Sequence, residues 1–188
     1  MTRSSRVTLA LAMLATLTAG CGYNTIQTMD ERVNQAQGQI QAQLQRRADL
    51  IPNLVNTVKG VTKQEDTVFI SIANARSRLS GAIQSGNVPE MAAANDQLSQ
   101  GLGRLIAISE NYPQLRSSEN FKQLQDQLEG TENRISVARQ DYNTAVGEYN
   151  AYIRRFPYNI TAKVFGMGKP REYFQAHPGA AEAPKVQF

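Results

Sequence analysis

The stretch FKQLQDQLEGTENRISVARQDYNTAVGEYNAYIRRF, residues 121–156, decides the fold class. Its apolar side chains are separated by alternating steps of three and four residues, which is the spacing of one face of an α-helix. A seven-residue repeat also favours a helix that runs along its partners instead of crossing them steeply. We therefore predict one long helix here, with Ser117 or Ser118 as its N-cap. Its stripe consists of Phe121, Leu124, Leu128, Thr131, Ile135, Ala138, Tyr142, Ala145, Tyr149, Tyr152 and Phe156.

Two further helices are predicted upstream, because apolar residues recur there at the same spacing. The first lies near residues 24–47 and carries the stripe Met29, Val33, Ala36, Ile40 and Leu44. The second is expected to begin after Asp49 as its N-cap, with Pro52 in its first turn, and to end near residues 85–86. Its stripe positions are Ile51, Val55, Val58, Val61, Glu65, Val68, Ile72, Ala75 and Leu79.

Another helix is predicted between these and the long one. Asn87 is a suitable N-cap, Pro89 fits the first turn, and the periodicity continues to Tyr112 and Pro113. The stripe reads Met91, Asn95, Leu98, Leu102, Leu105 and Ile108. The connections are short, as antiparallel neighbours require. The predicted fold is all-α: an up-and-down antiparallel four-helix bundle with long helices and an irregular C-terminal tail.

The C-terminal tail is expected in two parts. Pro157 ends the last helix, and residues 158–174 combine aromatic side chains with Gly166, Gly168 and Pro170. Because apolar side chains gain nothing in water, this segment is expected to pack back along the bundle, so that bundle and packed tail span residues 29–174. The composition of residues 175–188 is typical of a disordered C-terminus.

Residues 1–20 resemble a secretion signal. Two cations, Arg3 and Arg6, precede an apolar run, and small residues stand directly before Cys21. The 14 residues from 7 to 20 are fewer than the roughly 20 that a membrane-spanning helix needs, so cleavage is favoured over a retained span. Small residues ending at a cysteine resemble a bacterial lipobox, in which the thiol is acylated. The alternative is an ordinary signal peptide whose removal leaves a free thiol.

A lipobox would make residues 21–28 a linker between a lipid anchor at Cys21 and the bundle. The position three before the cysteine carries Thr18, where such signals most often carry Leu. Gly22, in place of Asp, resembles lipoproteins that are sent to an outer membrane. The expected location is the cell envelope, facing the periplasm or the exterior, with membrane lipid as the first partner.

The residue inventory excludes several kinds of site. The chain has one Cys, one His and no Trp, which rules out a Cys/His zinc site, an intrachain disulfide and, unless His177 served, a Ser-His-Asp triad. Its 20 Lys and Arg stand against 16 Asp and Glu, and two of the cations lie in the segment expected to be removed. Nucleic-acid binding needs cations clustered on one face, so we expect no nucleic-acid partner.

The motif RRADLIPNLV, residues 46–55, followed by VKG at 58–60, resembles the LemA family of bacterial envelope proteins. Further blocks look like that family's pattern in the same order, namely 73–77, 110–113, 124–135, 138–139, 141–143 and 156–157. The resemblance implies a helical bundle outside the cytoplasmic membrane, held by an N-terminal hydrophobic anchor. Many members look as if they keep a transmembrane helix where this chain has Cys21. No enzymatic activity or cofactor is settled for the family.

A set of polar residues is the main candidate site. Where the first two predicted helices meet, the chain carries Arg46, Arg47, Asp49 and Asn53, and the long helix carries Glu132, Arg139 and Asn143 at steps of seven and four. Paired guanidinium groups bind phosphate or carboxylate, so the set is a candidate docking site for a partner or an anionic headgroup. A structural network that fixes the bundle's register, or helix capping, explains the same residues, and we favour this second interpretation.

An enzyme is the weakest of the functional interpretations. Glu65 in an apolar slot, opposite Glu132, raises the idea of paired carboxylates, but di-iron bundles need Glu-x-x-His pairs that this chain lacks. We expect no catalytic residue, no metal site and no cofactor. The aromatic stripe formed by Tyr142, Tyr149, Tyr152 and Phe156 is expected to be core instead of a ligand box.

The sequence thus predicts a non-enzymatic, lipid-anchored helical scaffold or adaptor that binds as yet unidentified envelope proteins. The alternative is direct binding of anionic lipid and membrane shaping through Arg154, Arg155 and Phe156, together with Lys169 and Arg171. Self-association stays open, since a heptad stripe serves partners within and between chains equally well.

Overall fold

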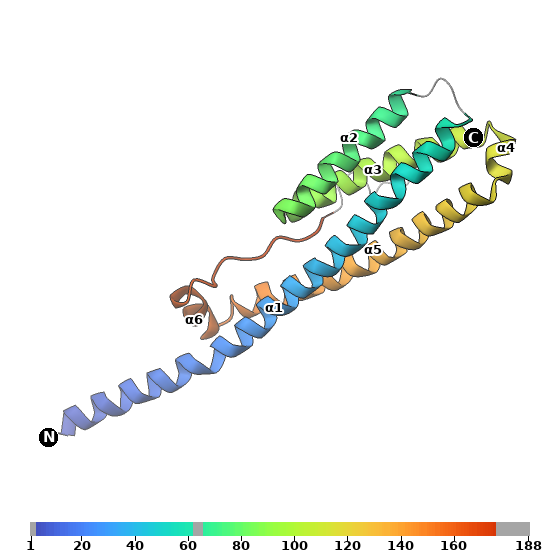
Figure 1. Ribbon diagram of the computed structural model, residues 1–188. Helices are drawn as coiled ribbons and strands as arrows, with labels where there is room; N and C mark the ends of the chain where they lie inside the picture. The colour runs from blue at the N-terminus through green and yellow to red at the C-terminus, as the bar shows by residue number, and fades with distance from the viewer. Residues whose placement is uncertain (1–2, 62–65, 176–188) are drawn as a thin grey trace, which may run out of the picture. The chain divides into compact units, whose positions relative to one another are not determined.

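The computed structural model describes the backbone of residues 3–61 and 66–175, and the side chains of these residues from Gly22 onward. This part of the chain contains six helices and no strand, which confirms the all-α prediction (Figure 1). Residues 1–2, the side chains of the rest of the signal segment and of Cys21, Glu65 and residues 176–188 fall outside the described part of the chain. The helices are α1 (Arg3–Lys59), α2 (Asp66–Ser85), α3 (Val88–Ser109), α4 (Pro113–Ser117), α5 (Glu119–Tyr152) and α6 (Tyr158–Val164).

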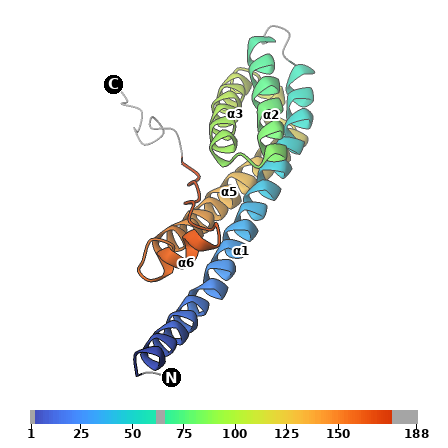
Figure 2. The same cartoon turned by 90° about the vertical axis from the view of Figure 1, so that its left-hand side faces the viewer.

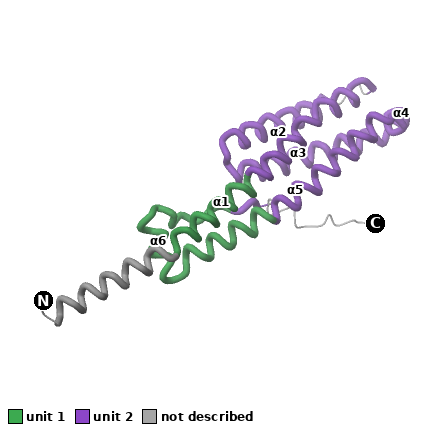
Figure 3. The backbone as a smooth tube through the Cα atoms, turned by 60° about the horizontal axis from the view of Figure 1, so that its bottom comes forward, with its two compact units in different colours: residues 1–37, 141–172 green, residues 38–140, 173–188 purple. Residues whose placement is uncertain are grey.

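The chain divides into two compact units (Figure 3). Unit 1 contains residues 1–37 and 141–172, and unit 2 contains residues 38–140 and 173–188. The helices α1 and α5 each contribute residues to both units.

Unit 2 is an up-and-down bundle of the second part of α1, α2, α3 and the first part of α5, with α4 as a short link before α5 (Figures 1 and 2). Apolar side chains from all four long helices fill its interior, because each helix has one apolar stripe to remove from water. The fully buried ones include Leu44, Ile51, Leu54, Val58, Ile72, Leu79, Met91, Leu98 and Leu105.

The predicted boundary between a first and a second helix at residues 47–49 is wrong, because α1 runs without a break to Lys59 and contains Pro52. A proline inside a helix has no N–H for the carbonyl four residues before it, which here is that of Ala48. Arg76 on α2 supplies the missing donor, since its Nε bonds to the Ala48 oxygen at 2.8 Å. Asp49 is therefore a residue within a helix and not an N-cap.

The second predicted helix is also wrong as a single element. Its expected stripe passed through Val61, but α1 ends at Lys59, Gly60 and Val61 form a turn, and α2 begins at Asp66. Val61 is 40% exposed, and Phe69 takes the buried position expected for Val68. The downstream positions Ile72, Ala75 and Leu79 are buried as predicted.

The predicted start of the helix after Ser85 is confirmed. Asn87 caps α3, and its Oδ1 accepts a hydrogen bond from the Glu90 amide at 3.1 Å. Gly86 before it has φ 67°, a left-handed conformation that favours glycine. Residues 113–117, expected as a connection, form the short helix α4, since Pro113 is pre-shaped for a first helical position.

The long helix predicted first ends earlier than its stripe suggested. The last buried residue of that stripe is Tyr149, and α5 ends at Tyr152. Phe156, expected in the core, is 79% exposed, because the residue before a proline disfavours helical geometry. The buried face also moves from Ala145 to Val146, since a helix of 3.6 residues per turn drifts against a seven-residue repeat.

Unit 1 joins the start of α1 to the end of α5, to α6 and to the segment that follows (Figure 3). That segment is held by side chains of α5. Tyr149 donates its hydroxyl to the Met167 carbonyl at 2.9 Å, and Asn150 exchanges two hydrogen bonds with the main chain of Arg171, at 2.8 and 2.9 Å. In the part of the chain whose side chains are described, no helix combines the length and the apolar character needed to cross a bilayer.

Candidate functional site

Arg47 on α1 is a buried charge in unit 2, with only 5% of its surface exposed. Its Nη1 donates to Oδ1 of Asn95 on α3 at 2.7 Å and pairs with Oε2 of Glu132 on α5 at 2.5 Å. Asn95 is itself buried, whereas half of the Glu132 side chain is exposed. Three helices of the bundle are therefore tied through one guanidinium group.

The electrostatics of this centre follow from its burial. Desolvation lowers the pKa of Arg47 below its ordinary value, and the charges of Glu132 and Asp96 act in the opposite direction. Arginine starts from so high a pKa that the group remains a cation. Its Nε and the Oε1 of Gln43, one turn earlier on α1, have no hydrogen-bond partner among the described residues. The centre is thus a charge that Asn95 and Glu132 compensate in the interior.

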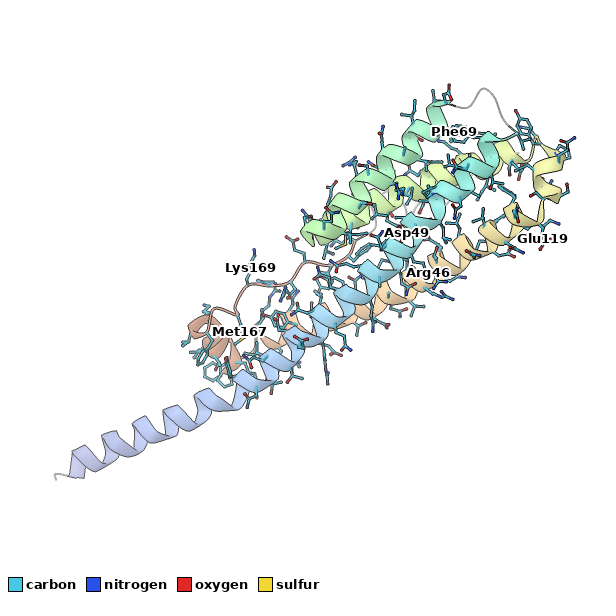
Figure 4. All side chains as sticks on the ribbon, in the orientation of Figure 1. Arg46, Asp49, Phe69, Glu119, Met167 and Lys169 are labelled. Carbon is cyan, nitrogen blue, oxygen red and sulfur yellow. The ribbon has the colours of Figure 1, made fainter. Side chains whose placement is uncertain are left out.

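No contact to the Arg47 guanidinium is seen for the other predicted polar residues, of which Figure 4 labels Arg46 and Asp49. Arg46 and Asp49 are exposed on α1, and Asp49 accepts a hydrogen bond from Gln45 at 2.8 Å. Arg139 is half-buried on α5, and Asn143 is half-buried in unit 1. Of the seven residues, the structure joins Arg47 and Glu132 directly.

Asn53 lines a surface hollow of about 290 Å³ in unit 2. The hollow lies on α1 and α5, and its lining carries four amide side chains, one hydroxyl group and one leucine. These residues are Asn53, Thr57, Asn120, Gln123, Leu124 and Gln127. Amides donate and accept hydrogen bonds without charge. The hollow, which we call the amide hollow, therefore suits an uncharged polar ligand such as a peptide main chain.

Unit 1 has a second polar centre, at Arg171. Its Nη2 and Nε donate to Oδ1 of Asp30 on α1 at 2.6 and 3.0 Å, and Nη2 reaches Oδ1 of Asn34 at 3.2 Å. The Tyr142 hydroxyl donates to the neighbouring Glu172 carbonyl at 2.8 Å. These bonds fasten the segment after α6 to both long helices of unit 1.

Burial raises the pKa values of two tyrosines in unit 1. For Tyr142 desolvation is the largest cause, and the Arg171 charge opposes it. For Tyr149 desolvation again leads, with Asp30 adding to it and Arg171 opposing. Both hydroxyl groups therefore stay protonated at neutral pH and act as donors.

Asn95 and Arg76 are important in the structure but were not predicted as site residues. Asn95 was predicted only as a stripe position, although an amide between apolar neighbours is a signal of a buried hydrogen bond. Arg76 gave no comparable signal, because its partner Ala48 is 28 residues away in the sequence. Arg171, named from the sequence as a candidate contact to anionic headgroups, is paired with Asp30. Among the described residues no three His, Cys, Asp or Glu side chains gather into a group suited to a metal ion.

Comparison with known proteins supports the family that the motif at residues 46–55 indicated. The magnetosome proteins MamQ 1 and MamQ 2 of Paramagnetospirillum magneticum are each 29% identical to this chain over 199 aligned positions, covering 94% of it and 72% of their own length. The magnetosome protein MamQ of Magnetospirillum gryphiswaldense is 27% identical over 190 positions, covering 87% of this chain and 68% of its own. The family profile matches residues 36–188, which is most of the chain, and this protein belongs to the LemA family.

Proposed function

We propose that this protein is a non-enzymatic scaffold of the bacterial cell envelope, held on a membrane through an acylated Cys21, whose bundle binds a protein partner. Three observations support the proposal. The N-terminal segment has the order of a lipoprotein signal. The chain belongs to the LemA family, and the resemblance to that family implies a helical bundle of the cell envelope. The related magnetosome proteins bear names that state a place in the cell and not a reaction.

The amide hollow is the observation that carries the partner-binding part. Four amides from two helices converge there on an uncharged surface. A peptide segment laid in the hollow would find both donors and acceptors for its main chain, and Leu124 offers an apolar contact beside them. Asn53, one of the residues singled out from the sequence, thus belongs to the docking surface in this proposal.

The Arg47 centre has a different role in this account. Its guanidinium is buried and already bonded to Asn95 and paired with Glu132, so a ligand would have to replace these contacts. We therefore assign Arg47 and Glu132 to the register of the bundle and not to docking. A single buried polar contact is known to specify the register of helices in this way.

The docking surface is tested by placing a photo-reactive amino acid at Gln123 in the full-length protein and irradiating living cells. The control position is Asn133, an exposed residue on another face of the same helix. The proposal predicts one discrete crosslinked envelope protein from position 123, absent from position 133 and lost when Asn53→Lys places a charge in the hollow. Equal capture at both positions, or capture that survives Asn53→Lys, would contradict it. Crosslinks to further copies of the chain alone would indicate self-assembly instead.

A further inference from the structure

Unit 1 exposes apolar side chains at α6 and its flanks. Within α6, Thr161 and Ala162 are buried, whereas Ile160 and Val164 are 54% and 72% exposed. Residues four apart in a helix share one face, so these two form one apolar strip. We call the following set the α6 surface: Phe156, Ile160, Val164 and Phe165, with the cations Arg154, Arg155, Lys163 and Lys169.

The concentration of apolar groups at this place is unusual for the molecule. The described residues contain eight strongly exposed large apolar side chains, and four of them fall within the ten residues 156–165. Phe156 is the most exposed of all, at 79%, and Phe165 is 54% exposed. Single exposed apolar residues need no explanation, but a contiguous group marks a surface that binds something.

The excess of positive charge in the chain lies on the same segment. Residues 149–171 contain five Lys and Arg and no Asp or Glu, which leaves 15 Lys and Arg against 16 Asp and Glu in the rest of the chain. Arg171 is paired with Asp30, and the other four cations are exposed. Apolar groups flanked by Lys and Arg are typical of segments that lie in the interface of an anionic membrane.

The α6 surface is fixed beside the residues that follow Cys21. A Cβ atom on Gly22 would come within 2.5 Å of the Tyr158 ring, so this ring lies directly on the Gly22 backbone. The rings of Tyr23 and Phe165 lie 4.6 Å apart, and those of Tyr152 and Tyr158 are stacked at 4.3 Å. The first two residues after the expected anchor therefore hold α6 and its flank in place.

We propose that the α6 surface lies in the headgroup region of the anionic membrane that holds the N-terminal segment, with its apolar side chains among the lipids. This inference rests on the membrane anchor of the proposed function. Anchoring at Cys21 would keep the surface near the bilayer, which raises its effective concentration there. The cations would then lie within the Debye length of the anionic headgroups, which is roughly 8–10 Å at physiological salt.

A lipid surface is favoured over a second copy of the chain as the occupant. Two α6 surfaces placed face to face would bring together two sets of four exposed cations, from a segment that has no carboxylate to balance them. Anionic headgroups supply that balance, and the acyl region accepts the aromatic and aliphatic side chains.

The absence of tryptophan from the chain allows a direct test. Ile160→Trp puts a single indole on the α6 surface, and Val137→Trp puts one on α5 at a position of similar exposure, 60% against 54%. Each full-length protein is reconstituted with vesicles of phosphatidylglycerol that carry bromine on their acyl chains. Flotation measures whether the protein is held on the membrane, and quenching by bromine measures whether the indole touches acyl chains.

The proposal predicts several-fold stronger quenching at position 160 than at 137. The quenching at position 160 should be lost when Arg154→Glu, Arg155→Glu and Lys163→Glu are combined. It should also be lost when phosphatidylcholine replaces the anionic lipid. Protein that floats without quenching at position 160 would overturn the α6 surface but leave the anchor intact. A blue shift at 160 without quenching would also overturn it, because protein and not lipid would then cover the indole. Protein that does not float at all would overturn both proposals.

Discussion

Arg76 of α2 supplies the hydrogen-bond donor that Pro52 denies to Ala48 of α1. The Nε of Arg76 lies 2.8 Å from the Ala48 oxygen, the carbonyl to which a residue with an N–H at position 52 would bond. Side-chain compensation from a neighbouring helix explains why α1 continues through a residue that normally kinks or ends a helix.

The first prediction concerns this compensation. Arg76→Leu should lower the free energy of unfolding by about 1 kcal/mol or more, because the Ala48 oxygen loses its partner. In a Pro52→Ala background the new N–H serves that oxygen, so the same substitution should cost clearly less. A double-mutant cycle in urea measures the difference. Arg78, two residues after Arg76, provides the control. Arg78→Leu removes a half-exposed ion pair with Glu90 and should show no coupling to Pro52. Equal costs in both backgrounds would contradict the account.

The second prediction concerns the buried cation. Asn95→Ala should destabilise the bundle by about 2 kcal/mol, because it strips a buried guanidinium of its neutral acceptor. Glu132→Gln should cost less, about 1 kcal/mol, since half of that side chain already faces water. The double variant Arg47→Met, Asn95→Leu should lose less unfolding free energy than the sum of the losses measured for Arg47→Met alone and Asn95→Leu alone. The exposed neighbour Arg46→Met is the control, with an expected change below about 0.5 kcal/mol. Additive costs for Arg47 and Asn95 would rule out the coupling.

The third prediction compares two glycines of α3. A Cβ on Gly101 would meet Cγ1 of the buried Ile72 at 2.9 Å, whereas a Cβ on Gly103 has nothing within 4 Å. Gly103→Ala should therefore stabilise the protein by up to about 1 kcal/mol through helix propensity. Gly101→Ala should destabilise it, because the buried Ile72 side chain must shift to make room for the added methyl group. Thermal unfolding measures both, and Ile72→Ala should remove most of the added cost at Gly101. Similar melting temperatures for the two alanine variants would disprove the close contact.

The fourth prediction concerns alkaline pH. The pKa values of Tyr142 and Tyr149 are raised in the folded chain, so the unfolded chain releases these protons first, near the ordinary tyrosine pKa of about 10. Their contribution to stability is therefore complete below that pH and is lost as the pH rises through the window up to the folded pKa values. Tyr142→Phe should cost about 1 kcal/mol at neutral pH and make the alkaline decline shallower. The decline is followed by urea unfolding at successive pH values, and an unchanged slope in the variant would contradict the assignment.

Much of the fold could be predicted from the sequence, because apolar periodicity and capping act locally. The stripe around Leu98 and Leu105, the Asn87 cap and the buried face of α5 up to Tyr149 all follow from such patterns. The errors lie where a distant group overrides a local rule. Pro52 with Asp49 is typical of a helix start, and only the Arg76 side chain, which no pattern near Pro52 reveals, makes an unbroken α1 favourable.

The candidate site was predictable in a more limited way. Charge and spacing identified Arg47 and Glu132, which the structure joins, but gave no reason to separate them from Arg46 or Arg139. Burial makes that distinction, and burial depends on the packing of three helices. The α6 surface was predicted in part, through Arg154, Arg155 and Phe156. Its attachment to Gly22 and Tyr23 could not be read from the sequence, because more than 130 residues separate the two segments.

In our proposal the protein acts at a membrane to which an acylated Cys21 anchors it. The most direct test is to fractionate cells that express the full-length protein or its Cys21→Ser variant and to measure the intact mass of each. The account predicts that the native protein sediments with membranes and has the mass of a chain that begins at Cys21 and carries acyl groups, and that the variant loses the acyl mass and leaves the membrane fraction in high salt. The same fractionation and the same modifications in both proteins would contradict it.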